Sequence, residues 1–371
     1  MNIFLGIITP LIIYLGITIL HLIIPVKRMK GYVKDEKTGE VLNYRINGKF
    51  VLVAGILIWF WLGFFNFVPF AWLHETRWWG LIGAVVIGLA YTFFIVLKHK
   101  SSGKPFIADL WLGRSKDPQI KNGLIDAKVW LYLIGAVMLM LNVLSSMAYH
   151  INLTSSASYN LTVDVSNVNI GFLFACGMLT WFCFDYLIFE KVHLWTYDFI
   201  AERVGFKLGF GCLAFYPFFY SVPVWAAAHL ANPGWPIWVT ILIGVLFLFG
   251  WTLTRGANMQ KYFFKTKPDK KFLFIKPQVL SDGKHSLLVN GFWGKSRHIN
   301  YLGEIIQALA IAIVIGFPEA IAWLALLYPA YYIFLMVTRQ IDDNKICKKK
   351  YGELWDQYTK KVKYRIIPFI Y

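Results

Sequence analysis

The chain has 371 residues, of which 58% are hydrophobic and only 15% are charged. Charged residues make up about a quarter of a typical soluble domain, so this composition excludes an ordinary soluble protein and a disordered chain. The chain is also strongly basic, with 37 Lys and Arg against 20 Asp and Glu and a formal net charge of +17. The basic residues lie between long uncharged stretches, which argues against nucleic-acid binding. The sequence therefore predicts an all-α polytopic membrane protein.

Nine apolar stretches with few or no charges follow one another along the chain, most of them near the length of about 20 residues that a helix needs to cross a bilayer. The first lacks a basic leader and a cleavage pattern, so it is expected to be a retained helix and not a signal peptide. The eighth is the shortest and contains Glu304 and Gln307. The predicted spans are residues 3–25, 50–73, 78–97, 129–149, 168–189, 208–231, 235–253, 301–316 and 318–337.

The loops between these stretches alternate between basic and neutral. Of the 37 Lys and Arg, 36 fall in residues 26–49, 98–128, 190–207, 255–300 and 338–371. Because basic loops stay on the cytoplasmic side, the N-terminus is predicted to lie outside and the C-terminus in the cytoplasm. The net charge thus reflects topology, and function is expected to concentrate in 255–300 and 338–371.

Three common features are not indicated, namely a Rossmann-type dinucleotide fingerprint, a disulfide and a metal site. Residues 209–214 match GxGxxA, but they lie in a predicted span, whereas a dinucleotide fingerprint connects a strand to a helix. The four cysteines form no CxxC pair and the histidines no HExxH pattern, so neither a disulfide nor a metal site is expected.

A basic helix is predicted after the seventh span. Asn258, Lys261 and Lys265 are spaced to share one helix face, which suits a phosphate-rich ligand. The alternative is a basic anchor whose side chains extend to the lipid headgroups.

A mixed polar and aromatic motif leads into the eighth span. An aromatic belt would explain Trp293 and Tyr301, but not Arg297, His298 and Asn300 beside them. The neighbouring glycines allow the backbone to approach a ligand closely. The motif therefore predicts a ligand site, to which Arg297 contributes a cation.

Arg339 and Asp343 lie at the base of the last span at positions i and i+4. A partly desolvated pair of this kind can position a proton donor or hold a ligand, and the alternative is a helix-end salt bridge.

Four blocks in order resemble the integral-membrane sterol reductases, the family of the delta-14 and delta-7 sterol reductases and the membrane domain of the lamin B receptor. The resemblance implies a ten-helix fold, one helix more than the nine stretches, and reduction of a ring double bond with NADPH. Weaker matches extend it through residues 31–48, 113–120 and 197–220. The four blocks are RGANMQK at 255–261, LLVNGFWGKSRHINYLGE at 287–304, DDNKICKKKYG at 342–352 and VKYRIIPFIY at 362–371.

The resemblance also assigns roles to individual positions. Its proton-donor cluster maps onto Arg339 and Asp343, with Tyr220 as the tyrosine. Lys265 stands where relatives usually have Arg, which keeps the charge but loses the bidentate fork. The implied NADPH contacts are Lys261, Lys265, Leu288, Trp293, Asn300, Tyr301, Asp343, Cys347, Lys348, Lys349, Lys350, Tyr351 and Tyr358.

The implied chemistry needs a buried acid, because an isolated C=C bond accepts hydride only after protonation has generated a tertiary carbocation. Burial favours the neutral form of Asp343 and Arg339 favours its carboxylate, so Asp343 and a tyrosine both remain candidate donors. Residues 113–119 and 126–135 depart from the family pattern. Cofactor binding is thus better supported than the sterol, and a related polycyclic lipid is an alternative substrate.

Two other functions stay open. An isoprenylcysteine-type methyltransferase, which binds S-adenosylmethionine, shares an Arg-His-x-x-Tyr-x-Gly motif but lacks RGANMQK and favours paired Glu where this chain has Asp342 and Asp343. A catalytically inactive, sterol-binding membrane protein is disfavoured because Arg339 and Asp343 are both intact.

We expect a single membrane domain over residues 1–371, with N-terminal helices in 1–207 and the catalytic and cofactor-binding half in 208–371. The expected partners are a sterol or related lipid and membrane lipids, and the oligomeric state stays open. The short chain without an appended domain favours a bacterial inner membrane over the endoplasmic reticulum.

Overall fold

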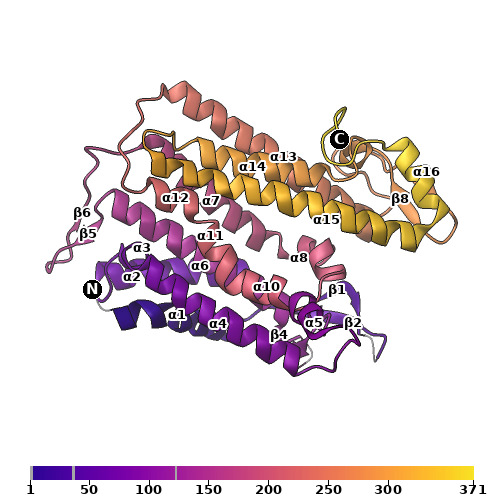
Figure 1. Cartoon of the computed structure of the whole chain (residues 1–371), viewed down its shortest axis with the longest axis horizontal. Helices are drawn as coiled ribbons and strands as arrows, with labels where there is room; N and C mark the ends of the chain where they lie inside the picture. The colour runs from indigo at the N-terminus through magenta and orange to yellow at the C-terminus, as the bar shows by residue number, and fades with distance from the viewer. Residues whose placement is uncertain (1–2, 36–37, 122) are drawn as a thin grey trace. The chain divides into compact units, whose positions relative to one another are not determined.

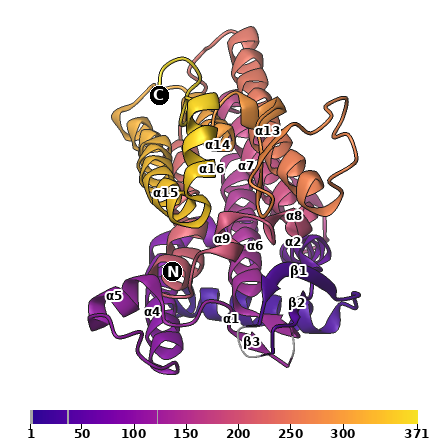
Figure 2. The same ribbon diagram turned by 90° about the vertical axis from the view of Figure 1, so that its right-hand side faces the viewer.

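The computed structural model describes residues 3–35, 38–121 and 123–371, most of which lie in helices. The chain divides into two compact units, residues 1–233 and residues 234–371 (Figures 1 and 2). Among the described residues, seven helices are long and apolar enough to cross a membrane. They span Ile3–Ile23, Arg77–Leu97, Ala127–His150, Ile170–Ile188, Phe206–Ala227, Ile237–Thr266 and Ala320–Tyr351.

The other two predicted spans form shorter apolar helices, Gly48–Phe64 and Ile299–Ile313. The predicted stretch 50–73 is wrong at its end. The helix stops at Phe64 because Asn66 takes a left-handed backbone conformation, with φ of 58°, and Pro69 has no N–H to continue the ladder. The short helix Trp72–Glu75 follows.

The first unit is built around α6, Ala127–His150, which is buried along almost its whole length. The helix α6 contacts α1, α2 and α7, so its polar residues Asn142, Ser145 and Ser146 are buried in the protein and not exposed to lipid. The Asp126 side chain caps α6 by accepting hydrogen bonds from the backbone N–H groups of Lys128 and Val129, both at 3.0 Å. The helices of this unit are α1 Ile3–Ile23, α2 Gly48–Phe64, α3 Trp72–Glu75, α4 Arg77–Leu97, α5 Phe106–Leu112, α6, α7 Ile170–Ile188, α8 Glu190–His193, α9 Tyr197–Ile200, α10 Phe206–Phe210, α11 Tyr216–Phe219 and α12 Val222–Ala227.

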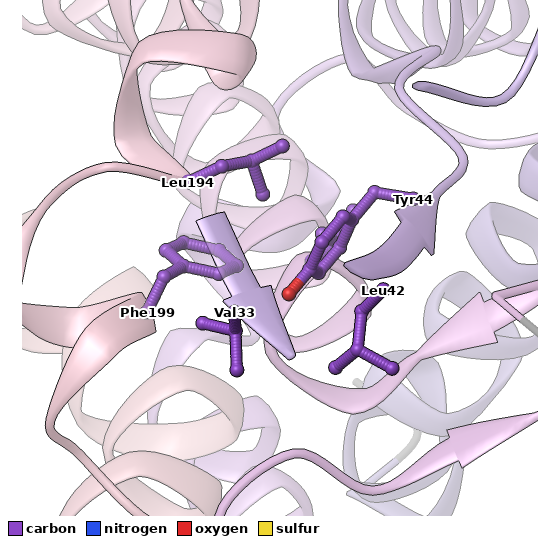
Figure 3. Close-up of a cluster of buried hydrophobic side chains, with 6 residues drawn as sticks. Val33, Leu42, Tyr44, Leu194 and Phe199 are labelled. Carbon is purple, nitrogen blue, oxygen red and sulfur yellow. The ribbon is translucent and has the colours of Figure 1, made fainter. Parts of the chain in front are cut away.

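Small antiparallel hairpins connect the helices, so the prediction of an all-α protein is correct for the spans and not for their loops. In the first unit β1, Met29–Lys34, pairs with β2, Val41–Tyr44. Figure 3 shows Val33 and Tyr44 of this hairpin packed with Phe199 of the segment after α7. The other pairs are β3 Gln119–Ile120 with β4 Ile125–Asp126, β5 Thr154–Ser155 with β6 Leu161–Thr162, and β7 Val279–Ser281 with β8 Ser286–Leu288.

The predicted span 208–231 is a broken helix. A π-helical turn at Gly211–Phe215 separates α10 from α11, and α12 begins one residue before Pro223. Proline has no N–H for the helix ladder, and other donors satisfy the nearby backbone. The carbonyl of Pro217 accepts hydrogen bonds from Asn142 Nδ2 at 3.0 Å and from Ser221 Oγ at 2.8 Å.

The second unit contains two long helices, α13 Ile237–Thr266 and α15 Leu327–Tyr351, with α14 Ile299–Ile313 between them in sequence. At 1.5 Å per residue, the 30 residues of α13 reach about 45 Å, which exceeds the hydrocarbon thickness of about 30 Å. The C-terminal turns of α13, which carry Lys261 and Lys265, are therefore expected to project beyond the bilayer core. Two 3₁₀ segments, Gly291–Gly294 and Ala320–Leu326, and the helix α16 Glu353–Lys361 complete the unit.

Glycine allows α13 and α14 to pack closely. A Cβ atom on Gly303 would collide with the carbonyl oxygen of Gly250 and with Thr254. The hydroxyl of Thr254 donates to the carbonyl of Asn300 at 3.0 Å and accepts from Gln307 Nε2 at 3.2 Å. These bonds explain how a short apolar helix tolerates Gln307, and they fix the start of α14 against α13.

Candidate cofactor and active site

The turn at Gly291–Gly294 is fastened to the projecting end of α13. Gln260 Oε1 accepts from the backbone N–H of Phe292 at 3.0 Å, and Gln260 Nε2 donates to the carbonyl of Asn290 at 3.2 Å. Trp293 Nε1 donates to the carbonyl of Ala257 at 2.8 Å. These bonds fix the Trp293 ring against the last turns of α13.

Lys261 lies beside this indole, with its ammonium nitrogen 5.3 Å from the centroid of the Trp293 ring. Gly291 has φ of 65°, and a Cβ atom there would collide with the amide of Gln260. Gly291 therefore lets the turn pack closely against α13, whereas the sequence predicted that the glycines of this motif allow a close approach to a ligand.

The start of α14 adds a buried imidazole. The ring of His298 stacks on Tyr301 with centroids 4.8 Å apart, and its Nδ1 lies 3.7 Å from Asp343 Oδ2. Burial, followed by the positive charges of Lys261 and Arg297, lowers the pKa of His298 to about 3. His298 is therefore neutral near pH 7, and its contact with Asp343 is polar and not ionic.

Two buried polar atoms at this point have no hydrogen-bond partner among the described residues. They are His298 Nε2 and Asn300 Oδ1. The amide nitrogen of Asn300 donates to Asn258 Oδ1 at 3.4 Å, so the orientation of the Asn300 side chain is set from α13. Buried polar atoms are usually paired, which makes these two candidates for ligand contacts.

Asp343 lies on α15 between cations from two helices. Lys261 of α13 and Arg339 of α15 both act electrostatically on its carboxylate, and its side chain is 25% exposed. Cys347 Sγ lies 3.9 Å from Asp343 Oδ1. Besides the predicted neighbour Arg339, Asp343 thus has two neighbours that are distant in sequence, Lys261 and His298.

An aromatic cluster from α16 closes this region. Trp355 stacks on Tyr358 with ring centroids 5.0 Å apart, and the hydroxyl of Tyr358 donates to the carbonyl of Trp293 at 3.4 Å. Burial raises the pKa of Tyr358, which is 4% exposed, so it stays a neutral phenol. Tyr351 and Leu288 are the remaining predicted aromatic and apolar contacts; Tyr351 stacks on Trp355, and Leu288 is buried at the end of β8.

The predicted lysines near this region are at the surface. Lys265, Lys348, Lys349 and Lys350 are exposed. Lys348 pairs with Asp356, while Lys265 and Lys350 lie over the rings of Phe264 and Tyr351. Exposed pairs of this type contribute little to stability, so these cations can bind a phosphate at small cost.

Tyr220 lies in the first unit, directly after α11. Its side chain is 8% exposed, and its ring centroid is 4.7 Å from that of Tyr216 and 6.2 Å from that of Phe182. The remaining predicted site residues all lie in the second unit.

Comparison with known proteins agrees with the sequence blocks at 255–371. The model of the ergosterol biosynthesis ERG4/ERG24 family matches residues 7–371. This chain belongs to that family. The Delta(14)-sterol reductase of Arabidopsis thaliana is 31% identical over 378 residues, covering 94% of this chain and 91% of that protein.

Two further relatives come from a bacterium and a yeast. The Delta(14)-sterol reductase of Methylotuvimicrobium alcaliphilum is 30% identical, covering 90% of this chain and 76% of its own length. That of Schizosaccharomyces pombe is 32% identical, covering 93% and 80%. The predicted family is therefore confirmed, and this ERG4/ERG24 family member is a multi-pass membrane protein.

In this family member the residues after α16 hold the polar motif in place. The backbone N–H groups of Arg297 and His298 donate to the carbonyls of Tyr364 and Arg365, at 3.0 and 2.9 Å. The Arg297 guanidinium reaches the carbonyl of Lys363 at 3.2 Å and Asn344 Oδ1 at 3.4 Å. Arg297, predicted as a cofactor contact, thus makes its described bonds to the protein itself.

Sequence reasoning missed three parts of the site. Gln260 supports the Trp293 turn, Asn344 accepts from Trp355 Nε1 at 3.1 Å, and Ser296 donates to the carbonyls of Arg365 and Ile366. Gln260 falls inside the RGANMQK block, so its position beside Asn258 and Lys261 was the available signal. Asn344 and Ser296 also fall inside the blocks at 342–352 and 287–304, and their positions beside Asp343 and Arg297 were the available signal.

Proposed function

We propose that this protein is an NADPH-dependent sterol reductase that reduces a carbon–carbon double bond of the sterol nucleus, delta-14 first and delta-7 as the alternative. The observation that carries the proposal is the cluster of Lys261, Trp293, His298, Asn300 and Asp343 in the second unit. The names of the three relatives support delta-14.

The residues of the second unit fit NADPH. Its phosphates need cations, and its carboxamide needs hydrogen-bonding partners in a place that excludes water. The unpartnered His298 Nε2 and Asn300 Oδ1 are available for such polar contacts. The cations proposed to hold the phosphates are Lys261, Lys265, Lys348, Lys349 and Lys350, with Trp293 and Tyr358 as the apolar wall.

Bound NADPH supplies the hydride. The chain must supply the proton that first adds to one alkene carbon, since only the resulting tertiary carbocation accepts hydride. We propose that Asp343 holds this proton, that Arg339 and Lys261 orient its carboxyl group, and that Tyr220 is the alternative donor. Neutral His298 can accept or donate a hydrogen bond beside Asp343 without adding a competing cation.

The proposed test incubates the purified protein with NADPH and a panel of delta-7, delta-14 and delta-24 sterols, followed by mass spectrometry. The expected product is a delta-14 sterol that has gained two hydrogen atoms while one NADPH is oxidised. A parallel reaction contains S-adenosylmethionine and an S-prenylcysteine, whose carboxylate would accept the methyl group. If no sterol is reduced in any reaction while a methyl group is transferred, the proposal is overturned in favour of the methyltransferase hypothesis.

Two further expectations belong to this proposal. We propose that residues 208–371 form the catalytic and cofactor-binding half and that the protein lies in a bacterial inner membrane, with the C-terminus in the cytoplasm. The bacterial relative, which matches 90% of this chain, supports the second point.

A further inference from the structure

A cavity of about 450 Å³ lies in the first unit, where α1, α2 and α7 end near one another. This volume falls in the range of roughly 300–1,000 Å³ that small-molecule sites occupy. Among the described residues that line it, four are cationic, namely Lys27, Arg28, Lys49 and Lys191, and Glu190 is the one acid. The cavity shares no residue with the site of the second unit.

The apolar side of this cavity is formed by residues of the spanning helices. Phe50 belongs to the first turn of α2, and Leu187 and Ile188 end α7. Phe50 and Ile188 are 49% and 50% exposed, as expected for side chains that face lipid. Cations and lipid-facing apolar residues thus meet where helices leave the bilayer core, at the depth of the lipid headgroups.

Glu190 does not cancel the positive charge. It is 6% exposed, and its Oε2 accepts a hydrogen bond from the backbone N–H of Gly48 at 2.8 Å. Burial raises the pKa of Glu190 to about 8, against the smaller opposing effects of the Gly48 N–H and the Lys49 ammonium. At pH 7 most of the carboxyl groups are protonated, so the four cations dominate the field in the cavity.

We propose that this cavity binds an anionic glycerophospholipid, with the headgroup phosphate among Lys27, Arg28, Lys49 and Lys191 and an acyl chain along Phe50 and Ile188. Charge complementarity selects an anionic headgroup, and the apolar wall selects a lipid over a free phosphate. The sequence predicts that this end of the helices is cytoplasmic, where anionic lipids face basic loops.

The test uses the full chain, delipidated in an uncharged detergent, and counts bound lipid by native mass spectrometry. Dioleoylphosphatidylglycerol is compared with dioleoylphosphatidylcholine and with sodium phosphate. Wild type is expected to retain one phosphatidylglycerol in preference to phosphatidylcholine. Removing three cations, as Lys27→Gln/Lys49→Gln/Lys191→Gln, should weaken this binding roughly tenfold or more. All three side chains are exposed, so the variant is expected to fold.

The matched control is Lys98→Gln/Lys100→Gln/Lys104→Gln, which removes three exposed cations outside the cavity in the same unit. It should keep the binding of wild type. A second variant, Ile188→Trp, keeps every charge and fills the apolar side, and it should also lose the lipid. Three results would each overturn the lipid site. They are an equal loss of phosphatidylglycerol in the control variant, retention of phosphatidylcholine equal to that of phosphatidylglycerol, and displacement of phosphatidylglycerol by sodium phosphate alone.

Discussion

The substitution Gln260→Leu tests whether the bonds from α13 to the Trp293 turn position a cofactor contact. Gln260 is 3% exposed and makes two hydrogen bonds to the backbone of Asn290 and Phe292. Leucine has nearly the same size, so the change removes both bonds without opening a large cavity. Each neutral hydrogen bond contributes about 0.5–1.5 kcal/mol, so the turn loses about 1–3 kcal/mol. If the loss appears fully in cofactor binding, the Kd for NADPH rises roughly 5- to 150-fold.

Binding of NADPH is measured by titration calorimetry on the purified protein, with thermal unfolding recorded in parallel. The control is Asn47→Leu, because Asn47 of the first unit is also buried and its Nδ2 also donates two hydrogen bonds, to the carbonyls of His21 and Ile24. It is expected to lower the Tm while changing the Kd for NADPH by less than about twofold. If Gln260→Leu leaves the Kd unchanged, or if both variants weaken NADPH equally, the positioning role of Gln260 is refuted.

Three further outcomes are expected. Asp343→Asn should lower kcat by about 10²–10⁴ with little change in the Kd for NADPH, because the proton donor is lost. Tyr220→Phe should keep its activity if Asp343 is the donor. The reverse result would assign the proton donation to Tyr220. Lys261→Met should raise the KM for NADPH about tenfold, because a cation proposed to hold a phosphate is lost. Lys360→Met, which removes an exposed cation on α16, should leave the KM unchanged. Equal effects of the two variants would contradict a contact between Lys261 and NADPH. Glu190 has a folded-state pKa of about 8 against its ordinary 4.5, so stability should fall by up to about 5 kcal/mol as pH rises from 4.5 through 8. Tm profiles of wild type should show this decline and Glu190→Gln should lack it; parallel profiles would contradict the burial effect.

Hydropathy predicted the spans well because a bilayer imposes length and composition on each helix independently of its neighbours. It failed where a helix boundary depends on something else. The predicted span 235–253 stopped at the charge of Arg255, yet α13 continues to Thr266 because its projecting turns pack against the Trp293 turn. The break inside 208–231 depends on proline and on Asn142, which is distant in sequence.

Local patterns predicted four motif residues, namely Lys261, Trp293, Asn300 and Asp343. In the structure Lys261 lies beside Trp293, Asp343 contacts His298, and Asn300 donates to Asn258. Gln260, Asn344 and Ser296 support the site through bonds to the backbone of distant segments. Such bonds leave no periodicity or charge pattern in the sequence, so only the folded chain reveals them.

The bonds from residues 296–298 to the carbonyls of Tyr364, Arg365 and Ile366 also constrain the order of assembly during synthesis. Residues 364–366 are translated after each of the described helices that is long enough to span the membrane. At about 5–20 residues per second, the ribosome needs roughly 3–15 s to pass from residue 298 to residue 366. During that interval Arg297 and the start of α14 lack these acceptors, so the region that contains the candidate site is completed only after all the spans have been made.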